Sequence, residues 1–168
     1  MRKMEFWFDF ASTYSYLTAM RIAALASAAE VKIAYRPFLL GPIFNSHGMT
    51  TSPFVLNPIK GRYMERDIGR IARSRGLEFR MPDRFPAHSL SAARIGLVAE
   101  AEGWIEAFTP AVFAAEFAHG EDIALPNVLA RIVSGLGHDP TRVFEAASTP
   151  EIKSALRTRT DTAAAKEI

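Results

Sequence analysis

Apolar positions divide the first forty residues into three elements. Residues 4–10 are almost continuously apolar and rich in aromatic side chains, interrupted only by Glu5 and Asp9, which is typical of a strand covered on both faces and central in its sheet. From Tyr14 to Glu30 the apolar residues recur at helical spacing, and residues 31–37 alternate like a half-buried or edge strand. This order predicts a βαβ unit with parallel strands and a right-handed crossover.

After Pro37 the pattern changes to a loop and then to helices. A loop of about 15 residues begins near Gly41, and loops of that length are often functional. Beyond it we expect helices at about 58–75, 88–103, 109–118, 125–137, 140–147 and 149–166. Four of these starts place a capping residue before a proline at the first helical position, namely Asn57-Pro58, Thr109-Pro110, Asp139-Pro140 and Thr149-Pro150.

These elements predict three parts of an α/β chain. They are an N-terminal βαβ part over residues 1–40, a helical insertion over 41–148 and a helix over 149–168 that returns to the first part. Two strands do not make a stable sheet, and a strand as apolar as residues 4–10 requires a neighbour on each side. We therefore expect either that a partner chain completes the sheet or that the chain is a shortened product.

Composition narrows the classes of function. The 168 residues are 49% hydrophobic and 23% charged, which supports one domain with a substantial core. The net charge is only +2, and acidic residues are interspersed in the arginine cluster at residues 66–75, so we interpret that cluster as a solvated helix face and expect no nucleic-acid partner. No apolar stretch approaches the roughly 18 residues of a membrane span, which favours a soluble, cytoplasmic protein.

The residues capable of metal or thiol chemistry are few. The sequence contains no cysteine, which excludes disulfides, thiolate metal sites and a dithiol redox cycle of its own. The four histidines, at positions 47, 88, 119 and 138, show no metal-ligand spacing, so no metal site is expected. Asp9, at the end of an apolar strand, is costly to bury alone, and we expect it to accept local hydrogen bonds or to pair with an arginine.

Several segments resemble a known enzyme family. Residues 8–17, Phe-Asp-Phe-Ala-Ser-Thr-Tyr-Ser-Tyr-Leu, resemble the start of the 2-hydroxychromene-2-carboxylate isomerases and the related kappa-class glutathione transferases, and the likeness continues at residues 40–44, 57–64, 85–94 and 156–165. The resemblance implies a DsbA-like thioredoxin fold with a large helical insertion, usually dimeric, that binds glutathione. In that family a cis-proline segment, two more strands and a last helix would follow residue 168. Thr13, Asn45, Met49 and His88 depart from the residues usual in that family.

The resemblance directs attention to the turn between the first strand and helix. Ser12 would lie at the helix N-terminus, where free N–H groups and the helix dipole stabilise an anion, and it would stabilise the thiolate of a bound glutathione. The plainer interpretation is that Ser12 only caps the helix. Tyr14, one residue into that helix, is a further candidate for binding glutathione or substrate.

Three more binding candidates lie beyond the second strand. Lys60 and Tyr63 are three residues apart and share a helix face. The resemblance places Lys60 near glutathione or an acidic substrate, although it could be an ordinary solvated lysine, and Tyr63 could be a packing residue. His47 lies in the long loop, where an imidazole could act as acid or base, or it could be an ordinary loop residue.

Two main hypotheses of function follow. The first is a glutathione-dependent isomerase of an aromatic, chromene-carboxylate-type acid, or a kappa-type glutathione transferase, working as a homodimer. The second is a shortened, inactive relative that serves as a dimeric interaction module. A protein disulfide oxidoreductase is suggested by the fold alone and disfavoured by the absence of cysteine.

Overall fold

The computed structural model describes residues 2–168. Its first three elements are strand β1 (Arg2–Phe8), helix α1 (Thr13–Ala28) and strand β2 (Val31–Pro37). The two strands pair in parallel, with Met4 opposite Ile33 and Phe8 opposite Pro37. The predicted βαβ unit is therefore confirmed, although the first strand begins and ends two residues earlier than the apolar run indicates. Within the described residues β1 has β2 as its one neighbour.

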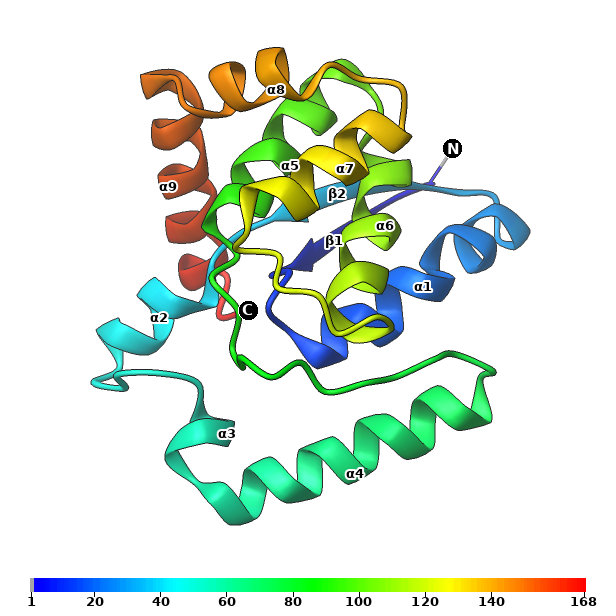
Figure 1. Ribbon diagram of the computed structural model, residues 1–168, viewed down its shortest axis with the longest axis vertical. Helices are drawn as coiled ribbons and strands as arrows, with labels where there is room; N and C mark the ends of the chain where they lie inside the picture. The colour runs from blue at the N-terminus through cyan, green and yellow to red at the C-terminus, as the bar shows by residue number, and fades with distance from the viewer. Residues whose placement is uncertain (1) are drawn as a thin grey trace.

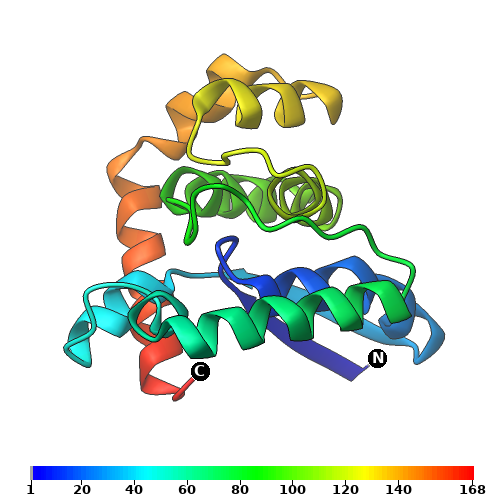
Figure 2. The same cartoon turned by 60° about the horizontal axis from the view of Figure 1, so that its bottom comes forward.

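The remaining elements are helical. They are α2 (Leu40–Ser46), α3 (Pro53–Leu56), α4 (Pro58–Ser74), α5 (Leu90–Glu102), α6 (Ile105–Phe117), α7 (Pro126–Gly135), α8 (Pro140–Ala147) and α9 (Pro150–Ala165). Figures 1 and 2 show α5 and α6 lying between the strands and the α7–α8 pair, while α9 runs along the side of these layers. No helix in residues 2–168 has the length and apolar character that crossing a membrane requires.

One aromatic core joins the strands to the helices. The rings of Phe8 and Phe10 both contact Phe113 of α6, with centroids 5.8 and 5.1 Å apart. Phe8, Phe10 and Phe113 have no exposed surface. Burial of aromatic rings of this size contributes about 2 kcal/mol or more each, so the helical segment and the βαβ unit are held by the same cluster of side chains.

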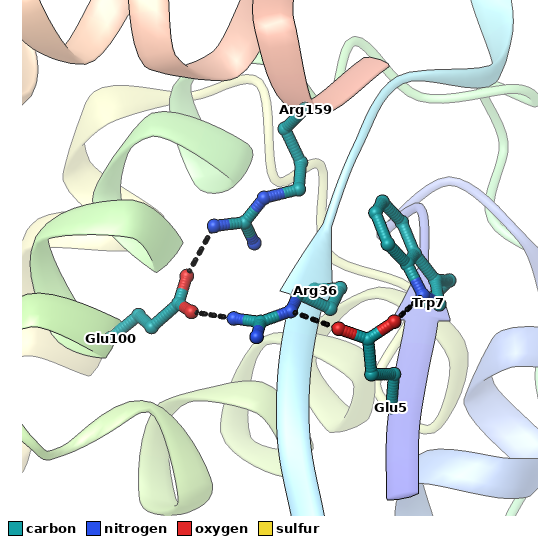
Figure 3. A network of polar contacts seen from close by, with 5 residues as sticks. All are labelled: Glu5, Trp7, Arg36, Glu100 and Arg159. Carbon is teal, nitrogen blue, oxygen red and sulfur yellow. Dashed lines mark hydrogen bonds and ion pairs between the residues drawn. The ribbon is translucent and has the colours of Figure 1, made fainter. Parts of the chain in front are cut away.

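A polar network holds α9 against the strands on the other side. Arg36 of β2 donates hydrogen bonds to Glu5 of β1, at 3.1 Å, and to Glu100 of α5. Arg159 of α9 donates to the other oxygen of Glu100 at 3.0 Å, and the Trp7 indole N–H donates to Glu5 at 3.1 Å. Figure 3 shows this chain of contacts. The Arg36, Glu100 and Arg159 side chains are partly buried, at 20–24% exposed, so these ion pairs hold α9 in a fixed orientation against β2 and α5.

The prediction of a structureless loop after Gly41 is wrong. The segment contains α2 and α3. The start of α2 is fixed by a distant contact, because the Leu40 N–H donates to the carboxylate of Asp9 at 2.7 Å. The start of α3 has a local signal, since Ser52 accepts from the Phe54 N–H and precedes a proline at the first helical position.

The predicted helix start at Thr109-Pro110 is also wrong. Helix α6 begins at Ile105, so Pro110 lies inside it. Ile105 and Phe108 are almost fully buried, and their burial offsets the backbone hydrogen bond that the proline removes. The other three cap-and-proline starts are confirmed, with Asn57, Asp139 and Thr149 each accepting a hydrogen bond from its helix.

Candidate functional site

A cavity of about 620 Å³ lies at the start of α1. Its wall comes from four separate stretches of chain: the turn from Asp9 to Thr13, the start of α2, the segment from Thr50 to Phe54, and the segment from Phe85 to Leu90. The Phe85–Pro86 peptide bond in the last stretch is cis. A volume of this order accommodates a small organic molecule.

Buried Asp9 connects three of these stretches. One of its carboxylate oxygens accepts from the Ala11 N–H at 2.9 Å and from the Ser89 hydroxyl at 2.6 Å, and the other accepts from the Leu40 N–H. Asp9 is 4% exposed, and this burial raises the pKa of its carboxyl group, while the bonds from Ser89, Ala11 and Leu40 lower it in part. The expectation of local hydrogen bonding is correct for Ala11, and no arginine pairs with Asp9 within residues 2–168.

Ser12 lies in the wall of the cavity as the N-cap of α1. Its side-chain oxygen accepts from the Ser15 N–H at 3.2 Å, and its own N–H donates to the Asp9 carbonyl. A hydroxyl that accepts through one lone pair keeps its proton free to donate. Ser12 therefore caps α1, and the cap leaves its hydroxyl available as a hydrogen-bond donor at the cavity wall for an anion.

The rest of the wall is mainly apolar and hydroxyl-bearing, and the Asn45 amide and the His88 imidazole also line it. Phe44, Phe54 and Phe85 supply aromatic surface, and residues 50–52 supply three hydroxyl groups. Among the residues that line this cavity none is lysine or arginine. Positive potential comes instead from the first turns of α1 and α5, whose N-terminal residues line the cavity.

The other four predicted site residues lie outside this wall. Lys60 and His47 are exposed, and Tyr63 is 63% exposed on α4. The Tyr14 hydroxyl donates to Asp67 at 3.3 Å, and its ring lies 6.2 Å from that of Phe54. Partial burial, with Asp67 adding to it, raises the pKa of the Tyr14 hydroxyl. Of the predicted residues the structure brings only Ser12 to the cavity, and the roles of the other four remain predictions.

Sequence reasoning did not assign the residues on the far side of the cavity. Ser89, Phe54 and the hydroxyls of residues 50–52 all line it. Ser52 carried a readable signal, since it precedes a proline as a cap, and Phe85-Pro86 belonged to a segment of family resemblance. Nothing local distinguishes Thr50 or Thr51 from other loop residues.

The fold and the cavity together define a thioredoxin-type α/β protein whose first helix presents its N-terminus to a ligand site. The chain belongs to the family of the DSBA-like thioredoxin domain, whose profile matches residues 3–168. Among solved structures it is similar to a 2-hydroxychromene-2-carboxylate isomerase, with a TM-score of 0.88 and 23% identity over 99% of this chain and 81% of that one.

A second similar structure is a probable DsbA oxidoreductase from Streptomyces coelicolor. Its TM-score is 0.77, with 22% identity over all of this chain and 77% of that one. No curated protein matches the sequence. At these identities the solved structures show a shared fold, which confirms the predicted fold class.

Proposed function

We propose that the chain is a glutathione-dependent isomerase of a small aromatic acid, with Ser12 stabilising the thiolate of bound glutathione. The observation that carries the proposal is the free hydroxyl proton of Ser12 at the N-terminus of α1, in the wall of a cavity with aromatic surface. Because the sequence has no cysteine, a thiolate at this position has to come from a ligand. A kappa-type glutathione transferase would use the same site.

The residues present fit the thiol end of glutathione. When bound, glutathione would supply a nucleophilic sulfur that adds to the unsaturated acid and leaves after rearrangement. Ser12 and the first N–H groups of α1 would hold its negative charge. Phe44, Phe54 and Phe85 would cover the ring of the acid and exclude water. Since no lysine or arginine lines the cavity, carboxylates in it would rest on hydroxyls, the His88 imidazole, backbone N–H groups and the α5 N-terminus.

Calorimetry with two ligands tests the proposal. Glutathione and S-methylglutathione have the same backbone, but the second has no ionisable thiol. We expect the wild-type protein to prefer glutathione by about tenfold and Ser12→Ala to remove that preference, because a hydrogen bond to a charged group contributes about 1.5–3 kcal/mol. Ser15→Ala is the matched control, since its hydroxyl lies in the same helix turn but outside the cavity wall.

Binding of both ligands with equal affinity in the wild type would contradict the role of Ser12, and no binding of either would contradict the glutathione proposal as a whole. The thiolate absorbance of bound glutathione gives an independent measurement. We expect the thiolate absorbance of bound glutathione to develop at lower pH than the absorbance of free glutathione, whose thiol has a pKa of about 8.5.

The alternative is a dimeric interaction module without catalytic activity. Either protein would be cytoplasmic. The module is favoured by the second edge of β1, which has no strand beside it within the described residues, and such an edge can pair with another chain. The enzyme hypothesis also expects a homodimer. Light scattering on the calorimetry sample tests the dimer that both expect, and glutathione binding separates the two: a dimer that binds no glutathione supports the module, and a dimer that binds it supports the enzyme.

A further inference from the structure

A second cavity of about 620 Å³ lies along α4 and shares no wall residue with the first. It is formed between α4 and the first residues of the connector that follows this helix, and Figure 1 shows the connector turning back along α4. We call it the arginine groove, after the three arginines in its wall. Arg66, Arg70 and Arg73 line it from α4, and Leu77, Phe79 and Met81 line it from the connector.

The inner side of the groove is apolar. Gly69 and buried Ala72 form the α4 side, and half-buried Leu77, Phe79 and Met81 form the connector side. A Cβ atom at Gly69 would lie 3.8 Å from the Phe79 ring. A single methyl group at position 69 would therefore just touch the Phe79 ring, so Gly69 and Ala72 give the groove a low apolar wall on the α4 side.

The rim of the groove is positively charged on balance, since three arginines and one acidic residue, Glu65, line it. Arg66, Arg70 and Arg73 follow one another at spacings of four and three residues, which places them on one face of α4. None of the ion pairs in residues 2–168 involves them. Residues 60–80 contain seven cationic and three acidic side chains, in a chain whose net charge is +2, so this segment carries the excess positive charge.

We propose that the arginine groove is a second ligand site, which binds a small organic anion with an apolar body, such as an aromatic sulfonate or carboxylate. A solvated helix face needs no apolar wall beside it, whereas here the guanidinium groups border one. Arginine binds carboxylate, sulfonate and phosphate groups through paired N–H donors, and the apolar wall would hold the rest of the molecule. This site does not depend on the function proposed for the Ser12 cavity.

The probe for this site is 8-anilinonaphthalene-1-sulfonate, compared with its uncharged relative N-phenyl-1-naphthylamine. The test variant is the double substitution Arg66→Gln with Arg70→Gln, and the matched control is Arg62→Gln, an exposed arginine of α4 outside the groove. We expect the double variant to bind the sulfonate about tenfold more weakly, because charge-assisted hydrogen bonds are lost. We expect its affinity for the uncharged probe to be unchanged. The Arg62→Gln control is expected to bind both probes as the wild type does.

A second variant tests the apolar half of the site. Gly69→Leu would place a larger apolar side chain in front of Phe79 while keeping all three arginines. We therefore expect it to weaken binding of the sulfonate as well. An unchanged sulfonate affinity in both variants would overturn the proposal. So would an equal loss in the Arg62→Gln control, because the effect would then come from general charge.

Vesicles of phosphatidylglycerol provide a further arm. Sedimentation of the protein with these vesicles that depends on Arg66 and Arg70, without arginine-dependent binding of the sulfonate, would overturn the small-molecule site in favour of a membrane surface. Thermal unfolding of each variant checks that it folds, since substitutions of exposed residues usually change stability by about 0.5 kcal/mol or less.

Discussion

Glu116 makes the stability of this protein depend on pH in an unusual direction. It lies on α6 with no exposed surface, and one carboxyl oxygen accepts from the Ile123 N–H at 3.3 Å, while the other has no partner within the described residues. Burial raises the pKa of Glu116 to about 8; the Ile123 bond lowers it in part, and nearby Asp122 raises it further. The folded protein therefore keeps this proton at neutral pH.

The direction and size of the effect follow from the two pKa values. Glu116 loses its proton at the ordinary pKa of 4.5 in the unfolded chain and at a pKa of about 8 in the folded chain. Between these values the unfolded state binds fewer protons, so the free energy of unfolding falls as pH rises. The contribution of protonated Glu116 to the free energy of unfolding is complete below about pH 4.5 and is lost above about pH 8. At about 1.4 kcal/mol per pKa unit, the loss is on the order of 5 kcal/mol at most.

Urea unfolding at several pH values between about 5 and 8 measures this loss. Glu116→Gln keeps the shape and a carbonyl oxygen for the Ile123 N–H, but it has no proton to lose. We expect the variant to match the wild type near pH 5 and to be more stable by several kcal/mol near pH 8. Glu106→Gln, an exposed site on the same helix, is the control. Parallel pH curves for Glu116→Gln and wild type would refute the reasoning, and any contribution from Asp9 cancels because both proteins contain it.

Four further substitutions, at three positions, test the packing around the Ser12 cavity. Gly61→Ala places a Cβ atom against the Phe54 carbonyl oxygen, closer than a Cβ atom can normally approach, so we expect thermal unfolding to show a loss of about 1–3 kcal/mol; an unchanged melting temperature would contradict this close approach. Ser89→Ala removes a hydrogen-bond donor from buried Asp9, so we expect urea unfolding to show a free energy of unfolding lower by about 1–3 kcal/mol; unchanged stability would contradict this. Ser12→Ala loses the helix cap, at about 1 kcal/mol, whereas Ser12→Asp keeps it; equal stability losses in the two variants would argue against capping.

The sequence pattern predicts the elements whose causes are local. The βαβ unit follows from the apolar run and the alternation, and three helices start where a capping residue precedes a proline. The two errors have distant causes. Helix α2 starts where Leu40 meets Asp9, 31 residues earlier, and α6 extends past Pro110 because Ile105 and Phe108 enter the core.

The same distinction applies to the sites. The position of Ser12 at the N-terminus of α1 could be predicted because a strand-to-helix turn is a local feature, whereas its role in binding was predicted from the family resemblance. The arginine groove could not, because the cluster on α4 gives no indication that Leu77, Phe79 and Met81 fold back beside it. Without that apolar wall, the simplest interpretation of arginines on a helix is a solvated face. The pattern of charges alone cannot distinguish such a face from a ligand site.

Asp9 shows how a local signal can specify that an interaction must exist without specifying its partners. A carboxylate at the end of a buried strand requires donors, since burying it unpaired is costly. The donors come from its own turn, from Leu40 and from Ser89, 80 residues away. These same segments form three sides of the Ser12 cavity. Satisfying one buried acid therefore brings the start of α1, the start of α2 and the start of α5 together, and the cavity forms where they meet.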